Sequence, residues 1–140
     1  MIQQNTFQKA SITTETARRI LAAAEAKACE MGIPSTIAIT DESGILKAFS
    51  RMDGAPLLTV QIAQDKAYTA SSFGMATDGW HDFIKNDPPL LYGVVKTERL
   101  IIFGGGYPIQ QDGTLIGGIG VSGGHYTQDM QIAQAGLAAM

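Results

Sequence analysis

Cysteine, histidine and clustered positive charge are all scarce in this sequence of 140 residues. A single cysteine excludes an internal disulfide, and two isolated histidines do not make the Cys/His pattern of a zinc site. The net charge is −3 and no stretch is rich in Lys or Arg, which argues against a nucleic-acid partner. The longest apolar run, LIIFGGG, is too short to cross a membrane, and the N-terminus lacks the apolar segment of a signal peptide. We therefore expect a cytoplasmic protein without membrane contact.

The residues that are abundant fit a globular domain. Hydrophobic residues make up 45% of the chain and charged residues 16%, enough apolar surface to form a core at this length. We predict one domain over residues 1–140, in which residues 1–12 form an N-terminal arm. Because charge is sparse while alanine and glycine are abundant, we expect other copies of the chain to cover part of the surface, in a homo-oligomer.

Hydrophobic periodicity predicts the order helix, two strands, helix, three strands, helix, with residues 76–97 irregular. The first helix is expected to begin at Thr13 or Thr14 and to end before Gly32. The later elements are predicted as a hairpin over 35–41 and 44–51, a helix from Pro56 to Gly74, three strands within 99–124 and a helix over 127–139. We assign Asp129 to the first turn of the last helix and Cys29 to the core.

One stretch has the written form of a dinucleotide-binding motif. Gly118, Gly120 and Gly123 spell G-x-G-x-x-G, which in such proteins is followed by a helix and a second parallel strand. Only 17 residues follow Gly123, and one helix uses them up. The Lys-Ser/Thr pair of a phosphate loop is missing as well. We therefore expect no nucleotide cofactor.

The glycines need another explanation, because glycine inside strands marks close approach of a backbone or a ligand. For Gly117, Gly118 and Gly120 we favour close packing of a helix or a second subunit. For two other groups we favour the floor of a ligand pocket; these are Gly104, Gly105 and Gly106, and Ser122, Gly123 and Gly124. The last three precede a predicted helix N-terminus, which attracts anions.

Four segments resemble the GlcG/HbpS family, which includes the C-terminal domain of PduO-type proteins: IAITDESGILKAFSRMDGA, DKAYTASSFGMAT, GGGYPIQQDGTLIGGIGVSGG and QDMQIAQAG. The resemblance implies an α+β, profilin-like fold, in which helices pack on a five-stranded antiparallel sheet. It also implies dimers or larger assemblies up to octamers. Members are described as haem-binding, some as haem-degrading or iron-binding, and others accompany enzymes of glycolate, diol or aromatic breakdown.

The sequence departs from the family pattern after VSGG. The family commonly has a Thr-Pro-Glu-like run and then Gln-Asp-Glu-Glu, whereas this chain has HYT and then QDMQ. Two acidic positions are lost, which argues against an iron site that depends on them, while His125 and Tyr126 are gained.

A first set of candidate residues is Arg51, Asp53 and Lys66. As a site, Arg51 would hold a carboxylate with two hydrogen bonds, and Asp53 or Lys66 would move a proton. As structure, Asp53 would form an ion pair with Arg51 or Lys66, or cap the helix that begins near Pro56. Both interpretations stay open.

His125 is the second candidate, because it follows two glycines and precedes a helix N-terminus, whose positive end favours the neutral imidazole. It would ligate haem iron or accept a proton, or else act as a cap. Tyr126 beside it can stack on a ligand ring. We interpret His81 as a surface residue rather than a ligand, with Trp80 and Phe83 around it as a possible lid.

Two functions follow from these residues and from the resemblance. The first is binding of haem or a related tetrapyrrole, with His125 as the iron ligand. The alternative is a catabolic isomerase, lyase or hydratase acting on a small organic acid held by Arg51 and the glycine loops. A structural accessory subunit is a third option.

Overall fold

The computed structural model describes residues 3–140, which form five α-helices, two short 3₁₀ helices and one four-stranded sheet. In chain order the elements are α1 (Thr14–Met31), β1 (Thr36–Asp41), β2 (Leu46–Arg51), α2 (Leu57–Phe73), η1 (Thr77–Gly79), α3 (Trp80–Ile84), α4 (Pro88–Gly93), η2 (Val94–Lys96), β3 (Gly106–Gln111), β4 (Thr114–Ser122) and α5 (Tyr126–Leu137). None of the helices in this part of the chain is long and apolar enough to cross a membrane.

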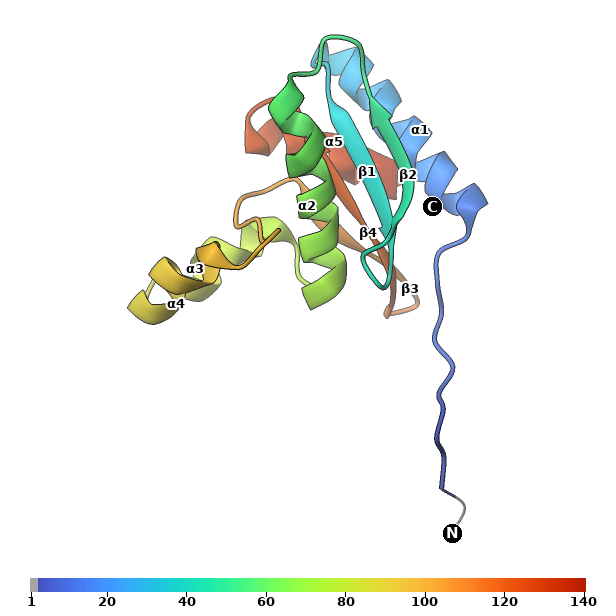
Figure 1. The fold of residues 1–140 in the computed structure, drawn as a ribbon. Helices are drawn as coiled ribbons and strands as arrows, with labels where there is room; N and C mark the ends of the chain where they lie inside the picture. The colour runs from blue at the N-terminus through green and yellow to red at the C-terminus, as the bar shows by residue number, and fades with distance from the viewer. Residues whose placement is uncertain (1–2) are drawn as a thin grey trace.

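The sheet is antiparallel throughout, with the strand order β2-β1-β4-β3. Helices α1 and α5 cover one face and α2 covers the other, which makes three layers (Figure 1). Short helices α3 and α4 project to one side of this body and are called the α3/α4 projection below (Figure 1). The α+β class with an antiparallel sheet is thus confirmed.

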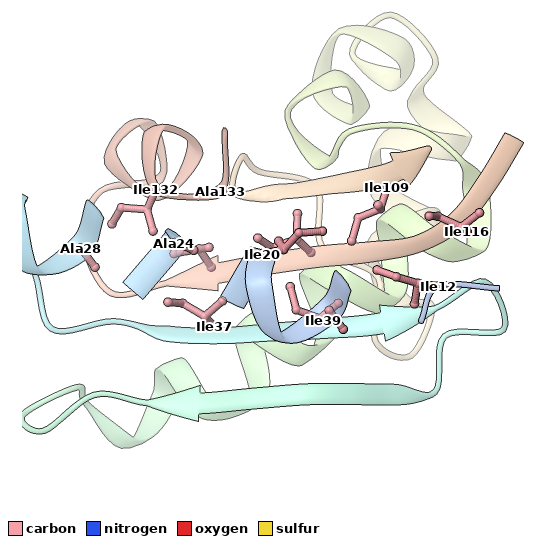
Figure 2. Packing of buried hydrophobic residues seen from close by; sticks show 13 residues of the cluster. Ile12, Ile20, Ala24, Ala28, Ile37, Ile39, Ile109, Ile116, Ile132 and Ala133 are labelled. Atoms are coloured by element: carbon pink, nitrogen blue, oxygen red, sulfur yellow. The ribbon is translucent and has the colours of Figure 1, made fainter. Parts of the chain in front are cut away.

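The main core lies between the sheet and the α1/α5 layer, and isoleucine and alanine dominate it (Figure 2). It includes Ile20, Ala24 and Ala28 of α1, Ile37 and Ile39 of β1, Ile119 and Val121 of β4, and Ile132 and Ala133 of α5. The α1 residues recur at a helical spacing and the β1 residues alternate, so each element turns one apolar face inward.

The second face of the sheet has a much smaller core, made of Ala38, Ala63 and Ala67. Helix α2 lies very close to β4 here. A Cβ added to Gly118 would lie 2.5 Å from the carbonyl oxygen of Ala67, and one added to Gly120 would overlap the carbonyl oxygen of Ala63. The interpretation of these two glycines as a packing surface for a helix is confirmed.

The close approach of α2 to β4 leads to a prediction about stability. We expect Gly120→Ala to lower the free energy of unfolding by about 3 kcal/mol, because helix backbone cannot yield as a flexible side chain does. Gly93→Ala is the matched control, since a Cβ there meets nothing within 4 Å. Denaturant titration of both variants tests this, and equal unfolding midpoints would contradict it.

The prediction of five strands is wrong, because residues 3–140 hold four. The missing strand was expected between Arg99 and Phe103. Its backbone bonds to a helix instead: the Thr69 hydroxyl donates to the Arg99 carbonyl at 2.9 Å and accepts from the Ile101 amide at 3.0 Å. Arg99 also has a positive φ of 67°, which breaks an extended conformation. The observed order is therefore α-β-β-α, then short helices, then β-β-α.

The other predicted elements agree with the structure to within a few residues. The Thr13 hydroxyl caps α1 and Gly32 ends it in the left-handed conformation. The hairpin begins at Thr36 and resumes at Leu46. Of the predicted arm, residues 1–2 lie outside the described residues and residues 3–11 are exposed without regular structure, whereas Ile12 is buried in the core. Cys29 is exposed, so its assignment to the core is wrong.

Candidate functional site

A cavity of about 540 Å³ lies between the η1/α3 segment, the segment before β3 and the start of α5. Its lining residues are Asp78, His81, Asp82, Ile102, Phe103, Gly104, Tyr126, Thr127 and Met130. Three chain segments that are distant in sequence thus meet at one site. The wall is apolar at Ile102, Phe103 and Met130, and acidic at Asp78 and Asp82.

The glycines before β3 allow two walls of this cavity to approach each other. A Cβ on Gly104 would lie 2.5 Å from the Met130 sulfur. A Cβ on Gly105 would lie 2.6 Å from the Lys66 Nζ atom, and one on Gly106 would lie 2.6 Å from the Lys66 carbonyl oxygen. Of these three glycines, only Gly104 lines the cavity; Gly105 and Gly106 pack against α2.

At the N-terminus of α5, backbone amides donate hydrogen bonds to side chains of the same segment. The Gly124 amide donates to Asp129 at 3.0 Å, and the His125 amide donates to Gln128 at 3.0 Å. The Thr127 amide donates to the His125 Nδ1 atom at 3.2 Å, which completes a capping box. These three amides are therefore already used by the cap and are not free for an anion.

Ser122, Gly123 and Gly124 do not line the cavity, in contrast to the pocket floor predicted for them. Ser122 is buried at the end of β4. A Cβ on Gly123 would lie 2.6 Å from the Pro34 carbonyl oxygen, and one on Gly124 would lie 2.5 Å from the Gln128 side-chain oxygen. These residues pack against the loop before β1 and the cap of α5.

His125 and Tyr126, adjacent in sequence, have different positions. Tyr126 lines the cavity, whereas the exposed His125 acts as the N-cap of α5. Its Nδ1 atom accepts the Thr127 amide hydrogen, which requires the proton of a neutral imidazole to be on Nε2. Its ring lies 4.2 Å from the Tyr126 ring, centroid to centroid. Of the two roles considered for His125, the cap is the one that the geometry shows.

His81, on α3, is exposed as the sequence pattern had indicated, and it also lines the cavity. Its ring makes no hydrogen bond to any residue in 3–140, so both nitrogens are available to a ligand. Trp80 does not form a lid, because it is buried and packs against Phe73 at 4.9 Å and Phe83 at 5.9 Å between ring centroids.

A buried ion pair lies behind the cavity. The Lys66 ammonium on α2 donates to the Val121 carbonyl oxygen at 2.7 Å and to an Asp129 carboxylate oxygen at 3.1 Å. The two side chains are 1% and 3% exposed. Burial lowers the pKa of Lys66, and Asp129 offsets this only in part; burial likewise raises the pKa of Asp129. Burial therefore disfavours the charged form of both partners, and the contact between them offsets part of this cost.

Arg51, Asp53 and Lys66 do not form one site. Arg51 ends β2 and donates to the Ala55 carbonyl oxygen at 3.0 Å; it lines a separate hollow of about 310 Å³ with Asp53 beside α1. Lys66 projects from α2, on the other side of the sheet, and its acidic partner is Asp129. Asp53 does not cap α2 either, since the N-cap residue of that helix is Pro56 and it has no side-chain cap hydrogen bond. A carboxylate clamp that joins Arg51 to the glycine loops is therefore not favoured.

Sequence reasoning missed Asp129, Phe103 and Met130 as neighbours of the site. One signal for Asp129 was present: a lysine among buried alanines of α2 requires a buried acid somewhere in the chain. For Phe103 and Met130, no local pattern indicated that their segments meet. Within the described part of the chain, no group of three or more His, Cys, Asp or Glu residues could hold a bare metal ion.

The sequence is similar to those of known proteins. The chain is 37% identical over 132 residues to a 15.0 kDa protein encoded in the dhaT-dhaS intergenic region of Citrobacter freundii, covering 93% of this chain and 92% of the relative. It is 38% identical over 120 residues to the corrinoid adenosyltransferase PduO of Salmonella typhimurium, covering 84% of this chain but 35% of that protein.

A solved structure and a family model extend the comparison. The crystal structure of a PduOC:Heme complex superposes with a TM-score of 0.86 at 34% identity, covering 94% of this chain and 96% of that one. The family model described as "Haem degrading protein HbpS-like" matches residues 12–138. The resemblance seen in the sequence is confirmed, and this chain belongs to the GlcG/HbpS family of HbpS-like proteins.

Proposed function

We propose that this protein binds haem or a related tetrapyrrole in the cavity between α3 and α5. The observation that carries the proposal is the meeting of His81, a free imidazole, with an apolar and aromatic wall in one hollow. A tetrapyrrole needs apolar contact for its ring faces and a donor for its iron. Support also comes from the structural relative that is described as a haem complex.

The residues present fit such a group. Ile102, Phe103 and Met130 supply apolar contact, and Tyr126 presents a ring that is 40% exposed. His81 would hold the iron, since neutral imidazole is a common haem ligand. When bound, haem would supply the electron-transfer or oxygen chemistry of its iron. His125, our first choice from the sequence, ranks lower because one ring nitrogen is committed to the helix cap and it lies outside the cavity lining.

Titration with hemin tests the proposal. We expect a sharp Soret band that saturates at about one haem per chain and quenching of Trp80, the only tryptophan. Trp80 directly precedes His81, and this places the fluorophore close to the proposed site. A broad absorbance that serum albumin removes, without saturation, would contradict the proposal.

We further propose that the protein is a single-domain homo-oligomer in the cytoplasm, between a dimer and an octamer. The α3/α4 projection supports assembly, because α4 has no buried residue and large apolar side chains are exposed around it. These are Phe73, Phe83, Leu90, Tyr92 and Val95. Light scattering after size exclusion gives the assembly size.

A further inference from the structure

The Lys66 amine is a buried nucleophile to which the proposed haem site assigns no task. An ammonium has three N–H donors. Lys66 directs two of them to Val121 and Asp129, at 2.7 and 3.1 Å. The remaining side of the Nζ atom faces the ring of Phe103, whose centroid is 5.2 Å away. One side of the amine is therefore covered by an aromatic ring and by no polar partner.

Phe103 is also a wall of the cavity, so this one side chain separates the amine from the hollow. It is 42% exposed, which shows that the body of the protein does not enclose it. The segment around it is anchored at Ile101 by Thr69 and is followed by three glycines, of which the second, Gly105, has a φ of 119°. Rotation of the Phe103 side chain towards solvent would open a path to Lys66 without moving a helix.

Lys66 itself is held in place. Its Nζ atom occupies the space where a Cβ on Gly105 would lie, and its two hydrogen bonds fix the direction of the amine. The carboxylate that contacts it, Asp129, can take up its proton. Desolvated lysines with a lowered pKa and a nearby base are the kind that form imines with carbonyl compounds.

We propose that Lys66 is a covalent attachment site for a small uncharged aldehyde or ketone that enters through the cavity past Phe103. The amine passes one proton to Asp129 and its lone pair forms a C–N bond to the carbonyl carbon. The two remaining amine hydrogens leave with the carbonyl oxygen as water. Asp129 then returns its proton to the nitrogen, so an iminium–carboxylate pair replaces the ammonium–carboxylate pair.

The class of ligand follows from the charges along the path. Asp78 and Asp82 line the cavity, and Asp129 lies beside the amine. A carboxylate on a compound small enough to reach the Lys66 amine would be buried beside Asp129 and repelled by it, whereas an uncharged compound meets the apolar surface of Ile102, Phe103 and Met130. The site thus differs from one for the organic acids considered from the sequence.

Reductive trapping tests this inference. The full chain is incubated with butanal and sodium cyanoborohydride near pH 7, and the position of the stable secondary amine is mapped by peptide mass spectrometry. Lys85 serves as the internal control, since it is an exposed lysine in an ion pair with Asp82. We expect severalfold faster labelling of Lys66, because burial lowers its pKa and so raises the neutral fraction, and because Asp129 lies within hydrogen-bond distance to remove the proton.

Two variants sharpen the result. Phe103→Ala removes the cover and should speed Lys66 labelling further while leaving Lys85 unchanged, and pyruvate in place of butanal should label Lys66 poorly. Labelling of Lys66 that is slower than that of Lys85, or that requires denaturant, would overturn the inference. The assay contains no haem, so its failure leaves the haem proposal standing, and the hemin titration is judged separately.

Discussion

Asp129→Ala is expected to lower the free energy of unfolding by about 3–5 kcal/mol, the usual effect of removing one partner from a buried ion pair. The variant leaves the Lys66 amine without its carboxylate in a site that is 1% exposed, and it also removes the acceptor of the Gly124 amide. Chemical denaturation followed by circular dichroism measures the loss.

Asp82→Ala is the matched control for this prediction. Asp82 and Lys85 form the same type of pair at 3.0 Å, but their side chains are 79% and 47% exposed. Exposed pairs of this kind contribute little, so we expect no measurable change in the unfolding midpoint. Asp129→Leu combined with Lys66→Met should recover most of the stability, because no charge is then left buried without a partner. A double variant as unstable as Asp129→Ala would show that the packing, and not the charge, was lost.

His81→Ala is expected to weaken hemin binding at least tenfold and to abolish the absorption spectrum of a histidine-ligated haem. The imidazole of His81 is the one histidine ring that lines the cavity in the described residues, and removing the iron donor leaves only contacts to the ring faces. Hemin titration followed by the Soret band and by Trp80 fluorescence provides the measurement.

His125→Ala is the control, since it removes the other histidine of the chain. This variant loses the cap of α5, so we expect the unfolding free energy to fall by about 1 kcal/mol while hemin affinity stays unchanged. The two variants therefore separate ligation from stability. If hemin binding were lost in His125→Ala and kept in His81→Ala, the ligand assignment would be wrong.

Local patterns were sufficient to predict most of the helices and the hairpins. Thr13 and Gly32 bound α1 in the structure as in the sequence, because capping depends on residues a few positions apart. The prediction of a fifth strand was wrong because it depended on a contact between residues far apart in the sequence. The Leu100–Phe103 stretch is apolar enough for a strand, but the hydroxyl of Thr69, about thirty residues earlier in the chain, takes its backbone hydrogen bonds.

The same distinction applies to the candidate site. Gly104 and Tyr126 were singled out from the sequence and do line the cavity, whereas Arg51 and Asp53 lie in a separate hollow. Strand alternation shows which residues share a face, but it does not reveal which helix covers that face. That is why the sequence offered Asp53 as one candidate partner of Lys66, whereas the structure pairs Lys66 with Asp129.

The sequence by itself determined the family, the α+β class and the role of Gly118 and Gly120 as a bare packing surface, because all three rest on short-range patterns and motifs. That helix α2 and not a second subunit covers the two glycines was decided by the tertiary structure. Only the tertiary structure decided which charges meet and which histidine faces a cavity. Burial forces Lys66 to find an acid wherever packing brings one within reach, and the N-cap of α5 holds His125 while α3 turns His81 towards the hollow.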